Sequence, residues 1–125
     1  ELFVTKDQHV LVNELAPRPH NSGHYTIEGC VTSQYENHIR AILGLPLGST
    51  ELIRPTVMKN IIGNVNKKAE VHGLEEAYKY PEVKIHIYGK EECRVGRKMG
   101  HITVTDKTIE DALFKARYAH SKIKF

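Results

Sequence analysis

Two short runs in the C-terminal half of the chain alternate apolar and polar side chains, and this alternation limits the fold more than any other feature. Residues 83–88 read Val-Lys-Ile-His-Ile-Tyr, and residues 101–105 read His-Ile-Thr-Val-Thr. Successive side chains of a β-strand point to opposite faces, so the alternation predicts two half-buried strands. The basic segment between them contains Gly96, and we expect a loop there.

The N-terminal residues favour a β-hairpin, a loop and a helix, in that order. Two β-prone runs, 1–5 and 9–13, flank a polar turn, which is typical of an antiparallel hairpin whose two ends lie together. Residues 15–31 contain two prolines and several polar groups, too many breakers for a helix interior, so we expect a loop. Ser33 has capping-box spacing to Glu36 and predicts the start of a helix that a glycine ends about ten residues later.

The remaining segments add one strand and two helices. We expect a strand at 57–62, a polar loop at 63–68 and a short helix at 74–80, which ends before a proline. A last helix begins near Thr108, because apolar residues recur after it at helical spacing. The strand–helix alternation of a doubly wound parallel sheet is missing, so the sequence predicts an α+β fold.

The composition is that of a globular chain. Of the 125 residues 40% are hydrophobic and 26% are charged, and no apolar run approaches the roughly 20 residues of a membrane helix. The net charge of +3 is small, which argues against a general nucleic-acid surface. Cys30 and Cys93 fit no zinc-binding or redox spacing, so a cytoplasmic setting is the simplest one.

Glu1 and Glu14 stand at the two ends of the predicted hairpin, which brings them together. Carboxylate and amide oxygens are the ligands that Mg²⁺ takes beside phosphates, and Asn13 supplies an amide next to Glu14. These three residues are therefore candidates for a metal and nucleotide site. The alternative is that both carboxylates are simply solvated strand ends.

The loop that follows carries side chains that bind anions or transfer protons: Arg18, His20, Asn21, Ser22 and His24. A zinc site formed by the two histidines would require helical geometry, which the neighbouring glycine and proline disfavour. The loop is either a ligand site or a hydrogen-bonded structural loop, since special loops cluster at functional sites without proving them.

A second candidate site is the basic loop before the last strand. Lys90, Arg94, Arg97 and Lys98 surround Gly96, and cations combined with glycine can hold a phosphate by charge and backbone N–H groups together. The alternative is a solvated basic loop tip.

Residues 13–26, which read NELAPRPHNSGHYT, closely resemble the signature of the 5-(carboxyamino)imidazole ribonucleotide synthetase family of ATP-grasp enzymes. The resemblance continues through 33–41, 44–48 and 96–101. Formate-dependent glycinamide ribonucleotide transformylases share the Pro-Arg-Pro-His core but typically continue with Asp-Thr-Gly. The sequence therefore favours the carboxylase family, with the transformylase as the enzymatic alternative.

The resemblance implies a reaction in which ATP phosphorylates bicarbonate and the carboxyl unit passes to the amine of 5-aminoimidazole ribonucleotide. It implies that Glu1 and Glu14 bind Mg²⁺, with Mn²⁺ as an alternative ion, and that Asn13 and Glu14 contact the ATP site. Physically these roles suit the chemistry, because Mg²⁺ neutralises the transferring phosphoryl group.

The resemblance also assigns the acceptor site. Catalytic and substrate-binding roles fall on Arg18, His20 and Asn21, with Ser22 as a further substrate-binding residue. The 5′-phosphate of the nucleotide is expected on three cations of the basic loop: Lys90, Arg97 and Lys98.

The family's full chain is longer, and the sequence here opens directly into an apolar run without an initiator methionine. We expect a cut within a strand, with residues 1–50 ending an ATP-grasp domain and 51–125 forming a β-rich lobe similar to a rudiment single-hybrid motif. The full-length protein is expected to be a cytoplasmic homodimer with no nucleic-acid or membrane partner. The isolated chain is expected to be inactive, and the non-enzymatic alternative is that it is a non-catalytic binding module.

Overall fold

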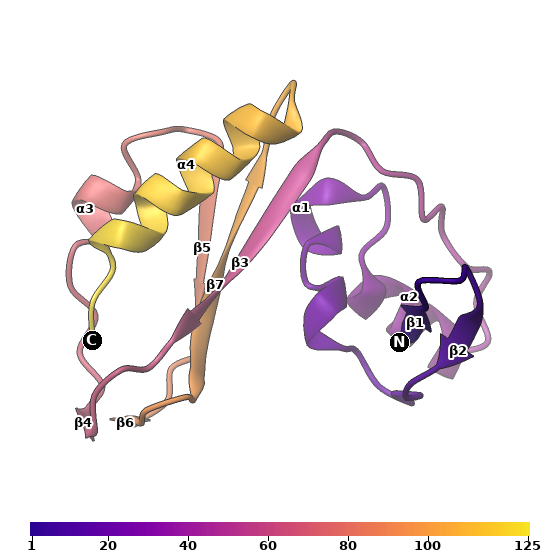
Figure 1. The fold of residues 1–125 in the computed structure, drawn as a ribbon, viewed down its shortest axis with the longest axis horizontal. Coiled ribbons are helices and arrows are strands. Elements are labelled where there is room, and N and C mark those ends of the chain that lie inside the picture. Colours follow the sequence, from indigo (N-terminus) through magenta and orange to yellow (C-terminus); the bar gives the residue numbers. More distant parts are fainter.

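The computed structural model describes residues 1–125, and Figure 1 shows two regions joined by one extended segment. The elements follow in this order: β1 (Leu2–Val4), β2 (Val10–Val12), the 3₁₀ helix η1 (Asn21–Gly23), α1 (Thr26–Gly29), α2 (Gln34–Ile42), β3 (Thr56–Ile62), β4 (Lys67–Lys68), α3 (Leu74–Ala77), β5 (Val83–Ile87), β6 (Glu92–Cys93), β7 (Lys98–Thr105) and α4 (Ile109–Lys122).

The C-terminal region is a three-stranded antiparallel sheet covered on one face by α4. The strand order is β3-β7-β5, so the last strand lies in the middle. Ile102 and Val104 of β7 are fully buried and face α4, whose Ala112, Ala116 and Ala119 are fully buried in return. Small residues on the helix let it lie close to the sheet, and this packing forms the core of the chain.

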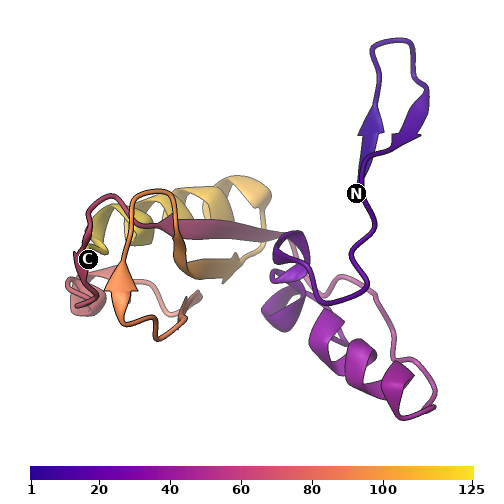
Figure 2. The same ribbon diagram turned by 90° about the horizontal axis from the view of Figure 1, so that it is seen from below.

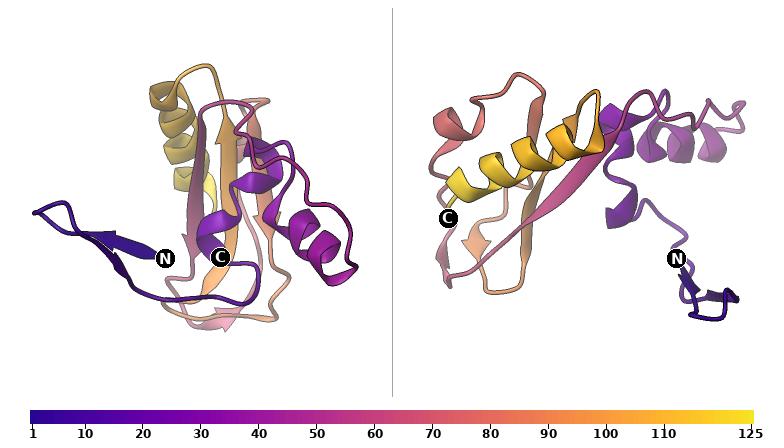
Figure 3. Two further views of the ribbon diagram at one scale, coloured as in Figure 1. Left: turned by 90° about the vertical axis from the view of Figure 1, so that its right-hand side faces the viewer. Right: turned by 45° about the horizontal axis from the view of Figure 1, so that its top comes forward.

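The N-terminal region is a hairpin followed by a loop and short helices. β1 pairs antiparallel with β2 in the register Leu2↔Val12 and Val4↔Val10, and all six strand residues are exposed. The hairpin projects away from the rest of the molecule, and α1 is the element of this region that contacts β7 (Figures 2 and 3). Residues 1–50 thus meet the sheet on the face that α4 leaves free.

The α+β class and the positions of the principal strands agree with the sequence prediction, but β7 is buried on both faces rather than half-buried, because residues 1–50 cover the face that α4 leaves free. β3, β5, β7 and α4 lie where alternation and helical spacing place them, and α4 is capped by Thr108, whose hydroxyl accepts from the Asp111 amide at 3.1 Å. Ser33 caps α2 in the same way, by accepting from the Glu36 amide at 3.1 Å. The reciprocal half of the capping box is not formed, because the Glu36 carboxylate pairs with Arg40 instead.

Other expectations need correction. Residues 15–31 are not loop throughout, because η1 and the single turn of α1 form after the prolines. The segment 63–68 includes β4, which pairs with β6 over only two residues, Lys67↔Cys93 and Lys68↔Glu92. The helix expected at 74–80 ends at Ala77, and β7 begins at Lys98 rather than at His101. The longest helix, α4, has 14 residues, and no helix meets the length and hydropathy that a membrane crossing requires.

Candidate functional site

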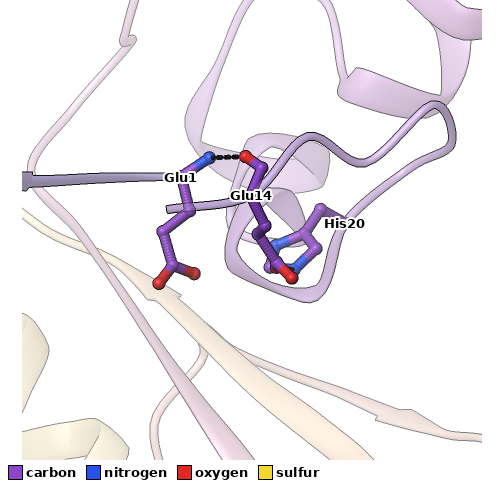
Figure 4. A group of neighbouring side chains, drawn as sticks. All are labelled: Glu1, Glu14 and His20. Atoms are coloured by element: carbon purple, nitrogen blue, oxygen red, sulfur yellow. Dashed lines mark hydrogen bonds and ion pairs between the residues drawn. The ribbon is translucent and has the colours of Figure 1, made fainter. Parts of the chain in front are cut away.

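The two glutamates predicted to meet at the open end of the hairpin do so. The backbone nitrogen of Glu1 donates to the Glu14 carbonyl oxygen at 2.8 Å, and the Asn13 amide nitrogen donates to the Glu1 backbone oxygen at 3.0 Å. One ligand atom each from Glu1, Glu14 and His20 lies within 4.8 Å of the other two (Figure 4). The hairpin therefore gathers two carboxylates and one imidazole from positions 13 and 19 residues apart.

These side chains suit a divalent cation that the protein coordinates from one side, with the other side open to solvent. The Asn13 side chain donates to Glu1 Oε1 at 2.8 Å and fixes the orientation of that carboxylate. The Glu14 Oε1 atom lies 3.0 Å from His20 Nε2. Carboxylate oxygens are the ligands that Mg²⁺ prefers, while an imidazole nitrogen in the set is better tolerated by Mn²⁺. Both carboxylates are exposed, so ligand positions remain open toward solvent.

The loop that carries His20 is held by the side-chain amide of Gln34 at the start of α2. Gln34 Oε1 accepts from the His20 backbone N–H at 2.8 Å, and Gln34 Nε2 donates to the His20 carbonyl oxygen at 2.8 Å. A Cβ at Gly23 would lie 2.4 Å from Gln34 Oε1, so only glycine leaves room for this amide. Sequence reasoning missed Gln34, because its contacts depend on how the loop folds back over α2.

The other predicted residues belong to the same loop, which Gln34 holds. The Ser22 hydroxyl lies 2.8 Å from His20 Nδ1, so it orients the imidazole whose other nitrogen faces Glu14. Arg18 is exposed, and its Nη1 donates to the Pro19 carbonyl oxygen at 3.2 Å. Asn21 begins η1, and its backbone oxygen accepts from His24 at 3.2 Å. Of Arg18, His20 and Asn21, only His20 contacts a carboxylate, that of Glu14.

Two cations of the basic loop bond to backbone oxygens of the same loop. Lys90 Nζ donates to the Lys98 carbonyl oxygen at 2.6 Å, and Arg97 Nη1 donates to the Glu92 carbonyl oxygen at 3.0 Å. Burial, followed by the positive charges of Arg97 and Lys98, lowers the pKa of Lys90 below its usual value. Arg94 differs from these cations because the Glu92 carboxylate pairs with it at 2.6 Å.

This crowding of like charge is what an anion relieves, since an ion of opposite sign between cations offsets their mutual repulsion. Lys90, Arg94 and Arg97 also line a hollow of 420 Å³, together with Glu91 and Glu92, whose carboxylates offset part of the positive charge. Gly96 has a φ of 80°, a conformation that glycine adopts without strain, and it turns the loop back into β7.

Between the two candidate sites lies a group of side chains of which sequence reasoning identified only His24 as a candidate. We call it the histidine seam and define it as His24, Glu28, His86, Tyr88 and His101. His86 and His101 pair across β5 and β7, and their rings stack with centroids 4.3 Å apart and planes 13° apart. His24 lies against the other side, with its ring centroid 5.0 Å from that of His101.

Hydrogen bonds anchor the seam at both ends. His86 Nε2 lies 2.7 Å from Glu28 Oε1, and the Tyr88 hydroxyl lies 2.8 Å from His101 Nδ1. His24 Nδ1 lies 2.9 Å from the Tyr35 hydroxyl. The only sequence signal for this group was the occurrence of histidine at polar positions of the two alternating strands, and its meaning depends on their register.

Two histidines of the seam, His24 and His101, favour the neutral form. Burial, followed by the charges of His86 and His24, lowers the pKa of His101 to about 4. Burial also lowers the pKa of His24, with further contributions from His86, Lys98 and His20.

Comparison with known proteins agrees with this architecture. Residues 56–115 match the family model described as the phosphoribosylaminoimidazole carboxylase C-terminal domain, and residues 1–35 match the ATP-grasp domain. The first match covers the sheet and the first half of α4, and the second covers the hairpin and the loop.

Individual relatives carry the same names. The chain is 56% identical over 103 residues to N5-carboxyaminoimidazole ribonucleotide synthase of Bacillus subtilis, covering 82% of this chain and 26% of that protein. The N5-carboxyaminoimidazole ribonucleotide synthetase structure of Thermotoga maritima matches 98% of this chain and 35% of that chain, with 57% identity and a TM-score of 0.90.

A third relative is N5-carboxyaminoimidazole synthase of Aspergillus clavatus in complex with ADP and 5-aminoimidazole ribonucleotide. It is 41% identical, with a TM-score of 0.81 over 96% of this chain and 33% of that chain. The present chain spans about a quarter of the length of these curated relatives, which are named as N5-carboxyaminoimidazole ribonucleotide synthases and phosphoribosylaminoimidazole carboxylases. The chain belongs to the N5-carboxyaminoimidazole ribonucleotide synthase family of ATP-grasp proteins.

Proposed function

We propose that this chain supplies part of the active site of an ATP-dependent ligase that carboxylates 5-aminoimidazole ribonucleotide with bicarbonate, in the purine biosynthetic pathway. The observation that carries the proposal is the presence of two complementary sites on one chain. A carboxylate cluster suits a metal-bound nucleotide, and a cation cluster suits a phosphate.

The carboxylate cluster is the proposed metal site. Glu1 and Glu14 would hold Mg²⁺, or Mn²⁺, with the Asn13 amide orienting the first carboxylate and contributing to the ATP site. When bound, the ion neutralises charge on the phosphates of ATP during phosphoryl transfer. The fit rests on two oxygen donors that face one another without a competing lysine or arginine among their contacts.

The loop between the two sites is the proposed place of carboxyl transfer. The exposed guanidinium of Arg18 suits an anion derived from bicarbonate, because a guanidinium offers several parallel N–H donors. His20 is oriented by Ser22 and faces Glu14, which allows it to hold or move a proton beside the reacting groups. Asn21 and Ser22 complete the proposed contacts to the substrate.

The basic loop is the proposed anchor of the acceptor. Lys90, Arg97 and Lys98 would hold the 5′-phosphate of 5-aminoimidazole ribonucleotide, and the hollow beside Lys90 and Arg97 offers space for it. With the phosphate held at this loop, the imidazole amine is free to reach the loop of Arg18 and His20. The structure of the Aspergillus relative contains both ADP and this nucleotide, which supports separate sites for the two ligands.

The proposal extends to assembly and location. The full-length protein would be a homodimer in the cytoplasm, where the two free cysteines, Cys30 and Cys93, remain reduced. By itself the 125-residue chain would bind ligands without turnover, because an ATP-grasp site closes on ATP between two lobes.

The experiment measures ADP release by the full-length protein with each combination of one-carbon acid and acceptor. We expect release to require bicarbonate and 5-aminoimidazole ribonucleotide together. Release supported by formate and glycinamide ribonucleotide would instead identify the transformylase. The 125-residue chain serves as the matched negative control, and bicarbonate-dependent release by it would contradict the division between lobes.

A further inference from the structure

The face of the sheet that α4 leaves free is unusually polar for a covered surface. It carries His86 and His101 at paired positions of β5 and β7, and Asn60 opposite His101 on β3. His101 is only 2% exposed, and its Nε2 atom is buried without a hydrogen-bond partner. Buried polar groups cost free energy unless they are paired, so a polar layer at this position calls for a reason other than packing.

This face is where residues 1–50 meet the C-terminal sheet, and very few polar contacts join the two. The contact between Glu28 Oε1 and His86 Nε2, at 2.7 Å, is the only hydrogen bond or ion pair between residues 1–50 and residues 56–125. Both side chains are largely covered. A charge-assisted contact shielded from water is stronger and more directional than an exposed one.

The seam continues from this contact toward both candidate sites. On one side the ring of His101 lies against His24, one residue beyond η1 in the loop that carries His20. On the other side, the Tyr88 hydroxyl bonds to His101, and Lys90 Nζ lies 5.7 Å from the centre of the Tyr88 ring. A continuous line of contacts therefore runs from the carboxyl-transfer loop to a cation of the proposed phosphate site.

Gly100 strengthens this arrangement from the backbone side. A Cβ at Gly100 would lie 2.3 Å from the His86 carbonyl oxygen, so glycine is required for β5 and β7 to approach at this point. The register of β7 against β3 also shifts between Ile61 and Ile62, opposite Gly100 and Lys98. Such irregularities re-aim neighbouring side chains, here at the junction between the seam and the basic loop.

We propose that Glu28, His86 and His101 are positioning residues that set the spacing between the carboxyl-transfer loop and the phosphate-binding loop. The inference rests on the proposed function and deepens it, because it assigns the alignment of acceptor and carboxyl donor to residues that touch neither. Loss of the contact between Glu28 and His86 leaves each site intact but lets the amine of the acceptor move away from the reactive carboxyl unit. The activated carboxyl unit is then lost to water while ATP is still consumed.

The decisive measurement is the ratio of ADP released to carboxylated nucleotide formed by the full-length protein. Glu28→Ala should raise this ratio by about tenfold or more, as expected for loss of a charge-assisted hydrogen bond. The Michaelis constant for ATP should stay within about twofold, because the nucleotide site lies on the hairpin side of the seam. Glu28→Gln retains a hydrogen-bonding group for His86 and should recover most of the coupling.

One further variant keeps the test decisive if Glu28→Ala does not fold, and another serves as the control. His86→Phe keeps a ring stacked on His101 and removes the Glu28 contact, so it should uncouple like Glu28→Ala. Glu36→Ala breaks an exposed ion pair with Arg40 within α2 and is the matched control. It should leave the ratio of ADP to product unchanged.

Amide hydrogen exchange without substrates separates this inference from the proposed function. Glu28→Ala should increase exchange in residues 20–31, whereas Glu36→Ala should not. If the unaltered protein shows no bicarbonate-dependent release, the proposed function fails, while the exchange result still judges the link. Two results would overturn the positioning role. One is a ratio of ADP to product that is unchanged in both Glu28→Ala and His86→Phe. The other is a ratio that rises equally in Glu28→Gln and Glu28→Ala.

Discussion

The two regions of the chain are stabilised in different ways. All twelve residues of the apolar core lie between Ile61 and Phe125. Within residues 1–50 only Gly29, Cys30 and Thr32 are buried, and the hairpin strands are exposed throughout. The C-terminal lobe thus has a core of its own, whereas the N-terminal region, which contains the signature run, has almost none.

Side-chain hydrogen bonds to the backbone take the place of a core in the N-terminal region. Gln34 bonds to both backbone groups of His20, and Asn37 bonds to both backbone groups of Gly48, at 2.8 and 3.3 Å. Such contacts fix geometry but contribute only about 0.5–1.5 kcal/mol each to stability. The backbone conformation near the carboxylates is therefore fixed by local hydrogen bonds, while most of the stability comes from the lobe that carries the basic loop.

The sharpest test of this division is a change that removes function without touching the core. Glu14→Gln in the full-length protein keeps the size of the side chain and removes the charge proposed to hold Mg²⁺. Turnover should fall by about a thousandfold, since the ion supplies several kcal/mol of charge stabilisation. The measurement is steady-state ADP release, with the unfolding midpoint as control. Near-normal turnover at ordinary Mg²⁺ would show that the metal assignment is wrong.

The second test compares the same side-chain truncation, isoleucine to alanine, in the two regions. Ile102→Ala empties a fully buried position of β7 and should lower the free energy of unfolding of the 125-residue chain by about 2–5 kcal/mol. Ile39→Ala on α2, where the side chain is 54% exposed, should cost less than about 0.5 kcal/mol. Chemical denaturation followed by circular dichroism measures both. Equal losses would mean that the N-terminal region contributes to one shared core.

The third test separates the basic loop from the carboxylate cluster. Lys90→Ala and Arg97→Ala in the full-length protein should raise the Michaelis constant for 5-aminoimidazole ribonucleotide by roughly ten- to a hundredfold, the value of one charge-assisted hydrogen bond to phosphate. The constant for ATP should change little. An analogue without the 5′-phosphate should lose this penalty. If both variants weaken ATP instead, the loop is not the phosphate site.

Most of the C-terminal fold could be predicted from local pattern. Alternation located β5 and β7, and helical spacing located α4, because each of these elements has one apolar and one polar face. β4 and β6 escaped prediction, since two residues are too few to show a period. α1 escaped because a single turn next to prolines and a glycine has no periodic signal of its own.

The candidate site was predictable to a different extent. The meeting of Glu1 and Glu14 follows from the hairpin alone, but the roles of the loop residues came from the resemblance to a family. Neither source gave the histidine seam. His86 and His101 are neighbours only because β5 and β7 pair in one register, and the contact with Glu28 arises across 58 residues of sequence. Tertiary register is information that local patterns do not contain.

The fourth test uses the pH dependence of stability to separate the contribution of the histidine seam from that of the rest of the lobe. Burial holds the pKa of His101 at about 4 in the folded chain, against 6.5 for an exposed histidine. The unfolded chain therefore binds a proton that the folded chain excludes as the pH falls from about 6.5 to 4. Stability is complete above this window and declines within it, by up to about 3 kcal/mol from His101.

The groups that face His101 set the control for this measurement. His86 and His24 lie against its ring, and Tyr88 bonds to it. The control variant must therefore keep the ring stacking while it removes the titrating nitrogens; the Tyr88 hydrogen bond is then lost at every pH, which lowers stability without changing its slope with pH. His101→Phe keeps an aromatic ring in the stack and should flatten the decline between pH 6.5 and 4. Some slope will remain, because burial also lowers the pKa of His24 and of His120 on α4.

The carboxylates titrate in a lower window, which keeps the two effects apart. Hydrogen bonds from Lys115 lower the pKa values of Asp106 and Glu82, so their stabilisation is present at neutral pH and is lost only below about pH 4.5. Urea unfolding of the 125-residue chain at half-unit steps of pH measures both windows. Equal slopes for the parent chain and His101→Phe above pH 4.5 would show that His101 is not held neutral by the fold, and that the seam tolerates a charge at its centre.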